Sequence, residues 1–107
     1  MKENDIVKAI LKYLKTVPHC FSWKEHGGMY GTAGIPDIIA CVNGRFVAFE
    51  VKTEIGKTTA LQDATIRMIN SAGGTAVGAR SVDEVRSIIE GLKKTTLTTH
   101  QRFNASL

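Results

Sequence analysis

Two carboxylates and one ammonium group lie within a short stretch of the chain, at Asp37, Glu50 and Lys52. Carboxylate oxygens are hard donors, which Mg²⁺ and Mn²⁺ prefer as ligands. A lysine beside such a metal can stabilise negative charge on a phosphate or on the oxygen that attacks it. These residue types suit metal-dependent hydrolysis of a phosphodiester, provided that the fold brings them together.

The dipeptide Asn43-Gly44 predicts how the fold does so. It separates two β-rich runs, Pro36–Val42 and Arg45–Lys52. Asn-Gly between such runs is typical of a two-residue hairpin turn, because both central residues of a type I′ turn need a positive φ. Counting back along both strands from this turn places Asp37 directly opposite Glu50.

Directly opposed residues of a hairpin have Cβ atoms about 4.5–5.5 Å apart, where two like charges repel. The neighbours of Asp37 and Glu50 on that face are apolar, so the two carboxylates would be poorly hydrated and must share a proton or a cation. Lys52 is two residues beyond Glu50 and therefore emerges on the same face. The sequence predicts one site made of these three side chains, although a β-bulge or a longer turn would shift the pairing.

Three helices and two further strands are predicted around the hairpin. Apolar residues at helical spacing predict helices over Glu3–Lys15, from Thr59 to Gly73, and from the capping Ser81 to Leu92. Strands are predicted over Cys20–His26 and Thr75–Ala79, with a glycine-rich loop over Gly27–Gly34. The order α-β-β-β-α-β-α predicts an α/β fold, with a mixed sheet and helices on both faces.

The apolar pattern also predicts which side chains are buried. The hairpin strands carry apolar residues on both faces, so we expect the hairpin to be central and covered on both sides, with Cys41 as a small core residue. For the second helix, five residues at helical spacing are expected to face the sheet: Leu61, Ala64, Met68, Ile69 and Ala72.

Length and composition indicate one domain over residues 1–92, followed by a polar tail over residues 93–107. No apolar run approaches the roughly 18 residues of a membrane span. The charged start differs from a secretory signal, so we expect an intracellular protein, cytoplasmic or associated with the nucleoid. A net charge of +4 is compatible with a polyanionic partner such as DNA. Cys20 and Cys41 are too isolated for a structural zinc site.

Three segments together resemble the VRR-NUC branch of the PD-(D/E)xK nucleases: Gly34-Ile35-Pro36-Asp37, Glu50-Val51-Lys52, and Gln62 in the following helix. The resemblance spans roughly Glu3–Leu92. It implies a restriction-endonuclease-like fold and a deoxyribonuclease that depends on Mg²⁺, with Mn²⁺ as a substitute.

The resemblance also implies a role for each matching residue. Asp37 and Glu50 would be metal ligands, and Val51 would contribute its main-chain carbonyl. Lys52 would be the catalytic lysine, and Gln62 would support the site. Glu3 would reach the metal directly or through water.

Alternatives remain open for several of these residues. Gln62 forms a capping box with Thr59 and needs no further role to explain it. Glu3 also suits the first turn of a helix, where the helix dipole favours an acid. For DNA contacts, the sequence offers the basic side chains of Lys8, Lys12 and Lys57.

The substrate and assembly follow from the resemblance alone. Small stand-alone members of this branch are similar to Holliday-junction resolvases, so the resemblance implies a homodimer that cuts branched DNA. A nuclease directed at flaps or ends has the same motifs, and so does a catalytically silent DNA-binding or assembly module with this fold.

Overall fold

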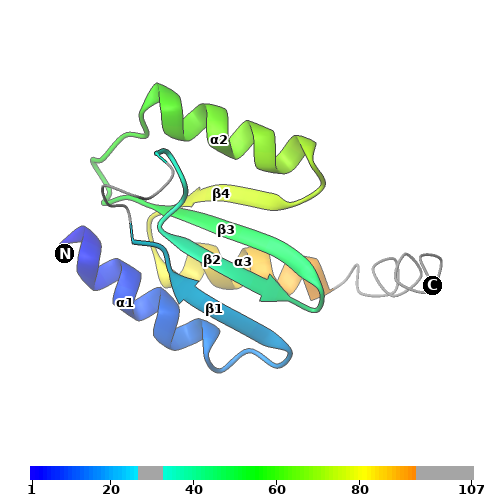
Figure 1. Cartoon of the computed structure of the whole chain (residues 1–107). Coiled ribbons are helices and arrows are strands. Elements are labelled where there is room, and N and C mark those ends of the chain that lie inside the picture. The colour runs from blue at the N-terminus through cyan, green and yellow to red at the C-terminus, as the bar shows by residue number, and fades with distance from the viewer. Residues whose placement is uncertain (27–32, 94–107) are drawn as a thin grey trace.

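The computed structural model describes residues 1–26 and 33–93 of the chain (Figure 1). Most of the predicted loop over Gly27–Gly34 and nearly all of the predicted tail lie outside the described residues. The observed elements follow the predicted order: α1 (Glu3–Leu14), β1 (Cys20–Lys24), β2 (Ile38–Val42), β3 (Arg45–Val51), α2 (Ala60–Ser71), β4 (Thr75–Ala79) and α3 (Val82–Lys93). The α/β prediction is confirmed, and the element ends differ from those predicted by two residues or fewer.

The four strands form one mixed sheet in the order β1-β2-β3-β4. β1 and β2 are antiparallel, as are β2 and β3, whereas β3 and β4 are parallel and are joined through α2. α2 lies on one face of the sheet, and α1 and α3 lie on the other (Figure 1). Helices therefore stand on both faces, as expected.

The β2–β3 turn has the predicted geometry. Asn43 and Gly44 both have positive φ, 52° and 80° respectively. Val42 pairs with Arg45, and the same register continues without a bulge to the pair Ile38 and Phe49. The next residues outward along the two strands are Asp37 and Glu50, so the predicted register is confirmed.

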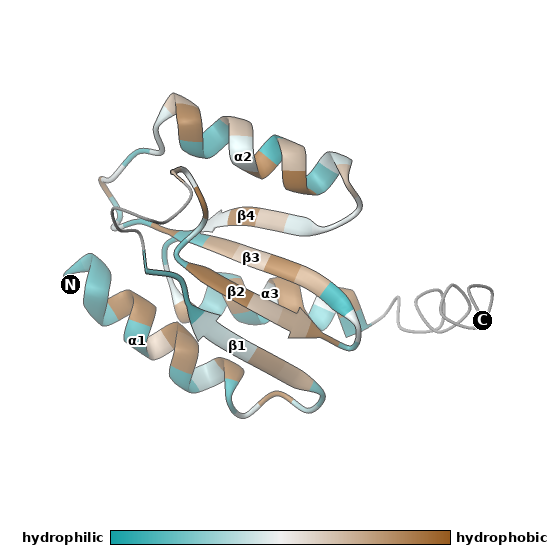
Figure 2. Ribbon diagram, viewed as in Figure 1, coloured by the Kyte–Doolittle hydropathy of each residue, from teal (hydrophilic) through white to brown (hydrophobic). Residues whose placement is uncertain are grey.

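The main hydrophobic core lies between the sheet and the pair α1 and α3. It is built from one face of each strand and one side of each helix, and Phe49, Ile10 and Leu14 are among its largest fully buried side chains. Figure 2 shows how strongly the hydrophobic residues concentrate in the strands. None of the helices among the described residues is long and apolar enough to cross a membrane.

The face covered by α2 departs from expectation. Leu61 and Met68 were predicted to face the sheet, but they are 51% and 62% exposed. Ala72 was predicted to face the sheet and is also exposed. Ile69 packs inward as predicted, together with Thr65 and Ile66, against a small cluster that includes the alanines of β3 and β4. The cluster consists of Ile39 of β2, Ala48 of β3 and Ala76 of β4.

Within residues 1–26 and 33–93, no helix covers the other half of this sheet face. Cys41 is exposed, so its prediction as a core residue was wrong. Phe46 is 46% exposed, and on the neighbouring β1 Phe21 and Trp23 are 70% and 41% exposed. The hairpin is therefore covered on both faces at one end and on one face only at the other.

Candidate functional site

The site lies at the end of the sheet where β3 and β4 finish and where α1, α2 and α3 begin (Figure 1). Asp37 and Glu50 meet here on the α2 side of the sheet. The β1–β2 ladder also reaches this point, since the Glu25 amide donates to the Asp37 carbonyl at 2.8 Å. Asp37 is thus held between β1 and β3, and its position follows from the hairpin register.

The Asp37 carboxylate is fixed by the backbone of β3. Its Oδ2 accepts a hydrogen bond from the Val51 amide at 2.7 Å. Because the N–H and C=O of one strand residue point towards the same neighbouring strand, the Val51 carbonyl is expected on the β2 side of β3 as well. The alternation continues at Lys52, whose amide points the other way and donates to the Ala79 carbonyl of β4 at 3.0 Å.

Glu50 is a buried carboxylate of which only one oxygen accepts a hydrogen bond among the described residues. Its side chain accepts a hydrogen bond at Oε1 from Gln62 Nε2 at 2.6 Å, and Lys52 Nζ stands 3.8 Å from the same oxygen. Glu50 is only 2% exposed, and its Oε2 has no hydrogen-bond partner among the described residues. A buried acceptor in this state is costly, and a cation would satisfy it.

Burial raises the pKa of Glu50 to about 7, with the negative charge of Asp37 as the second cause. Glu3 adds to the increase, whereas Lys52 and the Asp37 amide lower the pKa. At neutral pH this carboxyl group is therefore divided between its neutral and charged forms. A carboxylate pair held this way binds either a proton or a cation.

Lys52 is well placed beside the two acids. Its side chain is 15% exposed, so it is mostly withdrawn from water. A Cβ built on Gly56 would lie 3.5 Å from both Cβ and Cδ of Lys52, so the loop after β3 packs along the stem of the lysine. The ammonium group is thereby held close to Glu50.

Gln62 makes both the capping contacts and a contact with the candidate site. Its side-chain Oε1 accepts a hydrogen bond from the Thr59 backbone N–H at 2.9 Å. The Gln62 backbone N–H donates to Thr59 Oγ1 at 3.1 Å, which completes the capping box. Its Nε2 remains available and donates to Glu50. One side chain thus fixes the start of α2 and the orientation of the buried carboxylate.

Gly34 has a role that the sequence did not reveal. It has a φ of 82°, and a Cβ there would lie 2.8 Å from both Leu61 Cγ and Thr65 Oγ1. Only glycine combines this conformation with so close an approach. The segment that leads into Asp37 therefore rests directly on α2, the helix that carries Gln62.

The remaining predicted residues lie further out. Glu3 is exposed in the first turn of α1, near enough to Glu50 to raise its pKa. Within residues 1–26 and 33–93, however, no three His, Cys, Asp or Glu side chains come together closely enough to hold a metal ion by themselves. Lys57 is exposed in the loop after Lys52, while Lys8 and Lys12 are exposed on α1, on the opposite side of the sheet from α2.

Comparison with known proteins supports the fold. No family model matches the sequence, and no curated protein matches it. Among solved structures, one described as a "VRR_NUC domain protein" is similar with a TM-score of 0.68 and 22% sequence identity, over 85% of this chain and 87% of that one. Another, described as a "VRR_NUC domain", has a TM-score of 0.69 and 21% identity, over 82% and 94%. The restriction-endonuclease-like core expected from the motifs is thereby confirmed, and the chain has the fold of the VRR_NUC domain.

Proposed function

We propose that the chain is a divalent-metal-dependent deoxyribonuclease that hydrolyses phosphodiester bonds. The observation that carries the proposal is the buried Glu50 Oε2, which has no hydrogen-bond partner in the part of the chain that the structure describes. Glu50 forms a carboxylate pair with Asp37 beside the ammonium group of Lys52. The fold of the VRR_NUC structures gives independent support. Gln62 and Lys52 both contact Oε1 of Glu50, so a purely structural carboxylate in this position would leave the buried Oε2 uncompensated.

The donor set suits Mg²⁺, and Mn²⁺ as its substitute. Asp37, Glu50 and the Val51 carbonyl would hold the ion, and Glu3 would act through a water molecule, since the carboxylates do not form a closed cage. When bound, the ion supplies Lewis-acid stabilisation of the phosphate oxygens and makes water a stronger nucleophile at neutral pH.

The side chains around the ion stabilise charge and hold the two carboxylates in place. Lys52 stabilises the negative charge that develops on the phosphate and on the attacking oxygen. Gln62 holds the Glu50 carboxylate, and the Val51 amide holds that of Asp37, so neither has to reorganise when substrate arrives. Burial of Glu50 excludes bulk water and strengthens each of these interactions.

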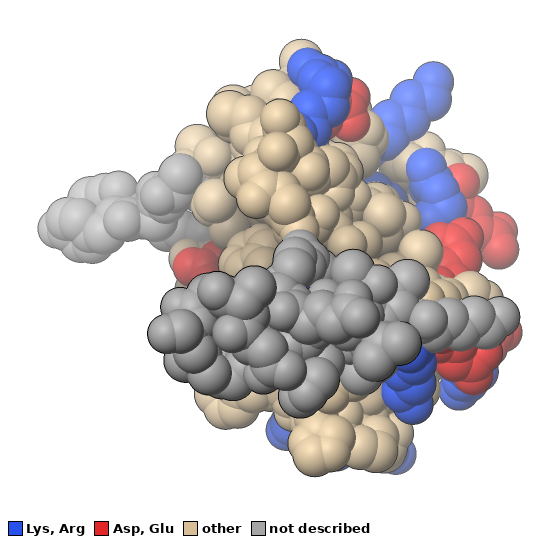
Figure 3. Space-filling model, turned by 90° about the vertical axis from the view of Figure 1, so that its right-hand side faces the viewer, with Lys and Arg blue, Asp and Glu red and all other residues tan. Residues whose placement is uncertain are grey.

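DNA is the proposed substrate because of the charge of the chain and its fold. The net charge is +4, and Lys57 next to the site and Lys8 and Lys12 on α1 are proposed to contact phosphates. Figure 3 shows the end of the molecule away from the site, where the basic side chains in view stand beside acidic ones.

An assay on branched and linear DNA tests the proposal. We expect the purified protein to cut a labelled four-way junction in Mg²⁺ or Mn²⁺ and to be inactive in a chelator. Lys52→Ala should reduce the rate by about 10²–10³-fold while DNA binding persists, and Arg67→Ala, which removes an exposed charge on α2, should leave it unchanged. The same experiment includes a flap and a linear duplex.

Each result distinguishes between the alternatives. Metal-independent binding without cleavage of any substrate would overturn the nuclease proposal and favour a silent DNA-binding module. Preference for the flap over the junction would favour a nuclease directed at flaps or ends. Equal cutting of linear duplex would remove the preference for branched DNA.

A homodimer is also proposed, with the open half of the α2-side sheet face as its contact. Phe21 and Trp23 lie on the edge strand β1 with ring centroids 5.7 Å apart, and Phe46 continues this apolar face on β3. Exposed apolar patches of this kind usually mark an interface. By analytical ultracentrifugation we expect a dimer for the wild type and a monomer for the double variant Phe21→Ser, Phe46→Ser. A monomeric wild type at high micromolar concentration would contradict the proposed dimer.

The proposed binding of DNA also suits an intracellular location for the protein.

A further inference from the structure

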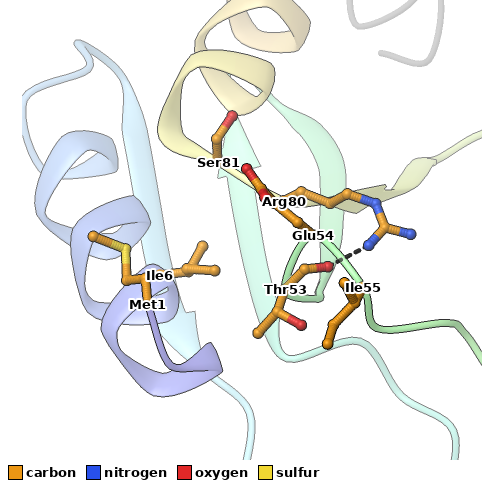
Figure 4. Close-up of a pocket in the computed structure, with 7 residues that line it drawn as sticks. All are labelled: Met1, Ile6, Thr53, Glu54, Ile55, Arg80 and Ser81. Atoms are coloured by element: carbon orange, nitrogen blue, oxygen red, sulfur yellow. Dashed lines mark hydrogen bonds between the residues drawn. The ribbon is translucent and has the colours of Figure 1, made fainter.

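A second feature of the site end is a pocket of about 590 Å³. It lies between the start of α1, where Ile6 lines it, and the segment Thr53–Ile55 that follows Lys52 (Figure 4). Arg80 and Ser81, between β4 and α3, line its third side. Its volume falls within the roughly 300–1,000 Å³ of sites that bind small organic molecules.

The pocket shares a wall with the candidate site. The Gly56 amide donates to the Thr53 carbonyl at 3.2 Å and closes a turn. The same carbonyl accepts a hydrogen bond from Arg80 Nη1, drawn as the dashed line in Figure 4. Because Gly56 packs against the stem of Lys52, this turn supports the lysine on one side and forms the pocket on the other.

The lining combines apolar side chains with one cation, Arg80, and one carboxylate, Glu54. Ile55 is 90% exposed, and faces the pocket together with the buried Ile6. Arg80 has five N–H donors in a planar fork, of which one is used by Thr53, and a fork of this kind matches the oxygens of a phosphate. An apolar wall with a guanidinium at one edge is complementary to a nucleotide, whose base is flat and largely apolar on its faces and whose phosphate is anionic.

We propose that this pocket binds one nucleotide of the DNA strand next to the scissile phosphodiester, with Arg80 on its phosphate and Ile55 against its base. The inference rests on the proposed function and deepens it. A base can enter such a pocket only when it is unpaired and unstacked. The preferred substrate is then DNA with an unpaired nucleotide beside the cleavage position, as at a branch point or a frayed end.

An NMR titration in chelator tests the pocket without any need for cleavage. The probe is thymidine 3′,5′-bisphosphate, with inorganic phosphate and thymidine added in separate experiments. We expect the bisphosphate to shift the backbone amide signals of Thr53, Ile55 and Arg80. Arg80→Ala should weaken its binding about tenfold or more, and Arg80→Lys should restore part of that loss.

Two further variants identify what is recognised. Ile55→Ser should weaken binding of the bisphosphate a few-fold and leave binding of inorganic phosphate unchanged, because it removes only the contact with the base. Ile55 is so exposed that this variant keeps the fold even if Arg80→Ala does not. Arg67→Ala serves as the control for loss of one positive charge and should bind as the wild type does.

The outcomes separate this inference from the proposed function. Shifts confined to other parts of the chain, or equal weakening by Arg67→Ala and Arg80→Ala, would overturn the pocket even if the wild type cuts DNA. Binding at the pocket by a protein that cuts nothing would support the pocket and count against the nuclease. Inorganic phosphate binding as tightly as the bisphosphate would show that no base is recognised and would also overturn it.

Discussion

Glu50→Gln is expected to abolish DNA cleavage and, in the metal-free protein, to increase stability. Glutamine has nearly the same shape and can still accept the hydrogen bond from Gln62 Nε2. It cannot provide the negative charge that holds a divalent cation. We expect the cleavage rate to fall by about 10³-fold, the upper range for losing one preorganised electrostatic contact.

The increase in stability has a separate cause. Burial raises the pKa of Glu50 to about 7, so at pH 8 the folded protein holds a buried charge that the unfolded chain would hydrate. Removing that charge should raise the free energy of unfolding at pH 8 by up to about 3 kcal/mol. Urea unfolding in chelator measures this, with the exposed Glu90→Gln as the matched control. A variant that is less stable than the wild type at pH 8, or that still cuts DNA at the wild-type rate, would contradict the prediction.

Metal-free wild type should lose stability as the pH rises, and divalent metal should restore it. The folded pKa of Glu50 is about 7 and the ordinary value is 4.5, so between these values the folded state binds more protons than the unfolded state. By linkage, the free energy of unfolding then decreases as the pH rises through this window, by up to about 3 kcal/mol in total. Above pH 7 a bound cation replaces the proton and reverses the loss.

Urea midpoints at pH 5.5 and pH 8, in chelator and in Mg²⁺, test both parts. The stabilisation by Mg²⁺ should be large at pH 8 and small at pH 5.5, where Glu50 is protonated. Other groups titrate in this range, so the relevant quantity is the difference between wild type and Glu50→Gln. If the two proteins show the same dependence on pH and on Mg²⁺, Glu50 is neither the titrating group nor a metal ligand.

Local rules were enough to predict the centre of the site. The Asn43-Gly44 turn requires positive φ at two successive residues, and this requirement fixes the register of the two strands. Once the register is known, the opposition of Asp37 and Glu50 follows, and Lys52 follows by alternation. Only the dipeptide and the period of a strand are needed for this prediction.

The parts that sequence could not predict depend on long-range packing. Leu61 and Met68 have the spacing of a buried helical face, yet α2 presents Thr65, Ile66 and Ile69 to the sheet. The rotation of a helix about its own axis is decided by the surface on which it lands, here the small side chains Ala48 and Ala76. The exposure of Cys41 has the same origin, since α2 is too narrow to cover both halves of the sheet.

Contacts between residues far apart in the sequence could not be predicted from sequence patterns either. The sequence predicted Gln62 as a cap or as a site residue, but that it contacts both Thr59 and Glu50 depends on the chain folding back over a separation of 12 residues. The link from Arg80 to Thr53 spans 27 residues and has no signature in the sequence. Gly34 needs its φ and the proximity of α2 to explain it, and neither can be read from the sequence alone.

α2 buries few of its side chains, and this affects how much of the time the candidate site is assembled. Thr65 is the only buried residue of this helix, whereas α1 buries four. Asn70, near its C-terminal end, exchanges two hydrogen bonds with the backbone of Ala76, and Gln62 at its start holds Glu50. A helix that buries so few of its side chains opens at a lower free energy than the rest of the core. Each opening removes the amide that orients Glu50 and admits water to the carboxylate, so the fraction of time that the site is assembled equals the fraction of time that α2 is docked.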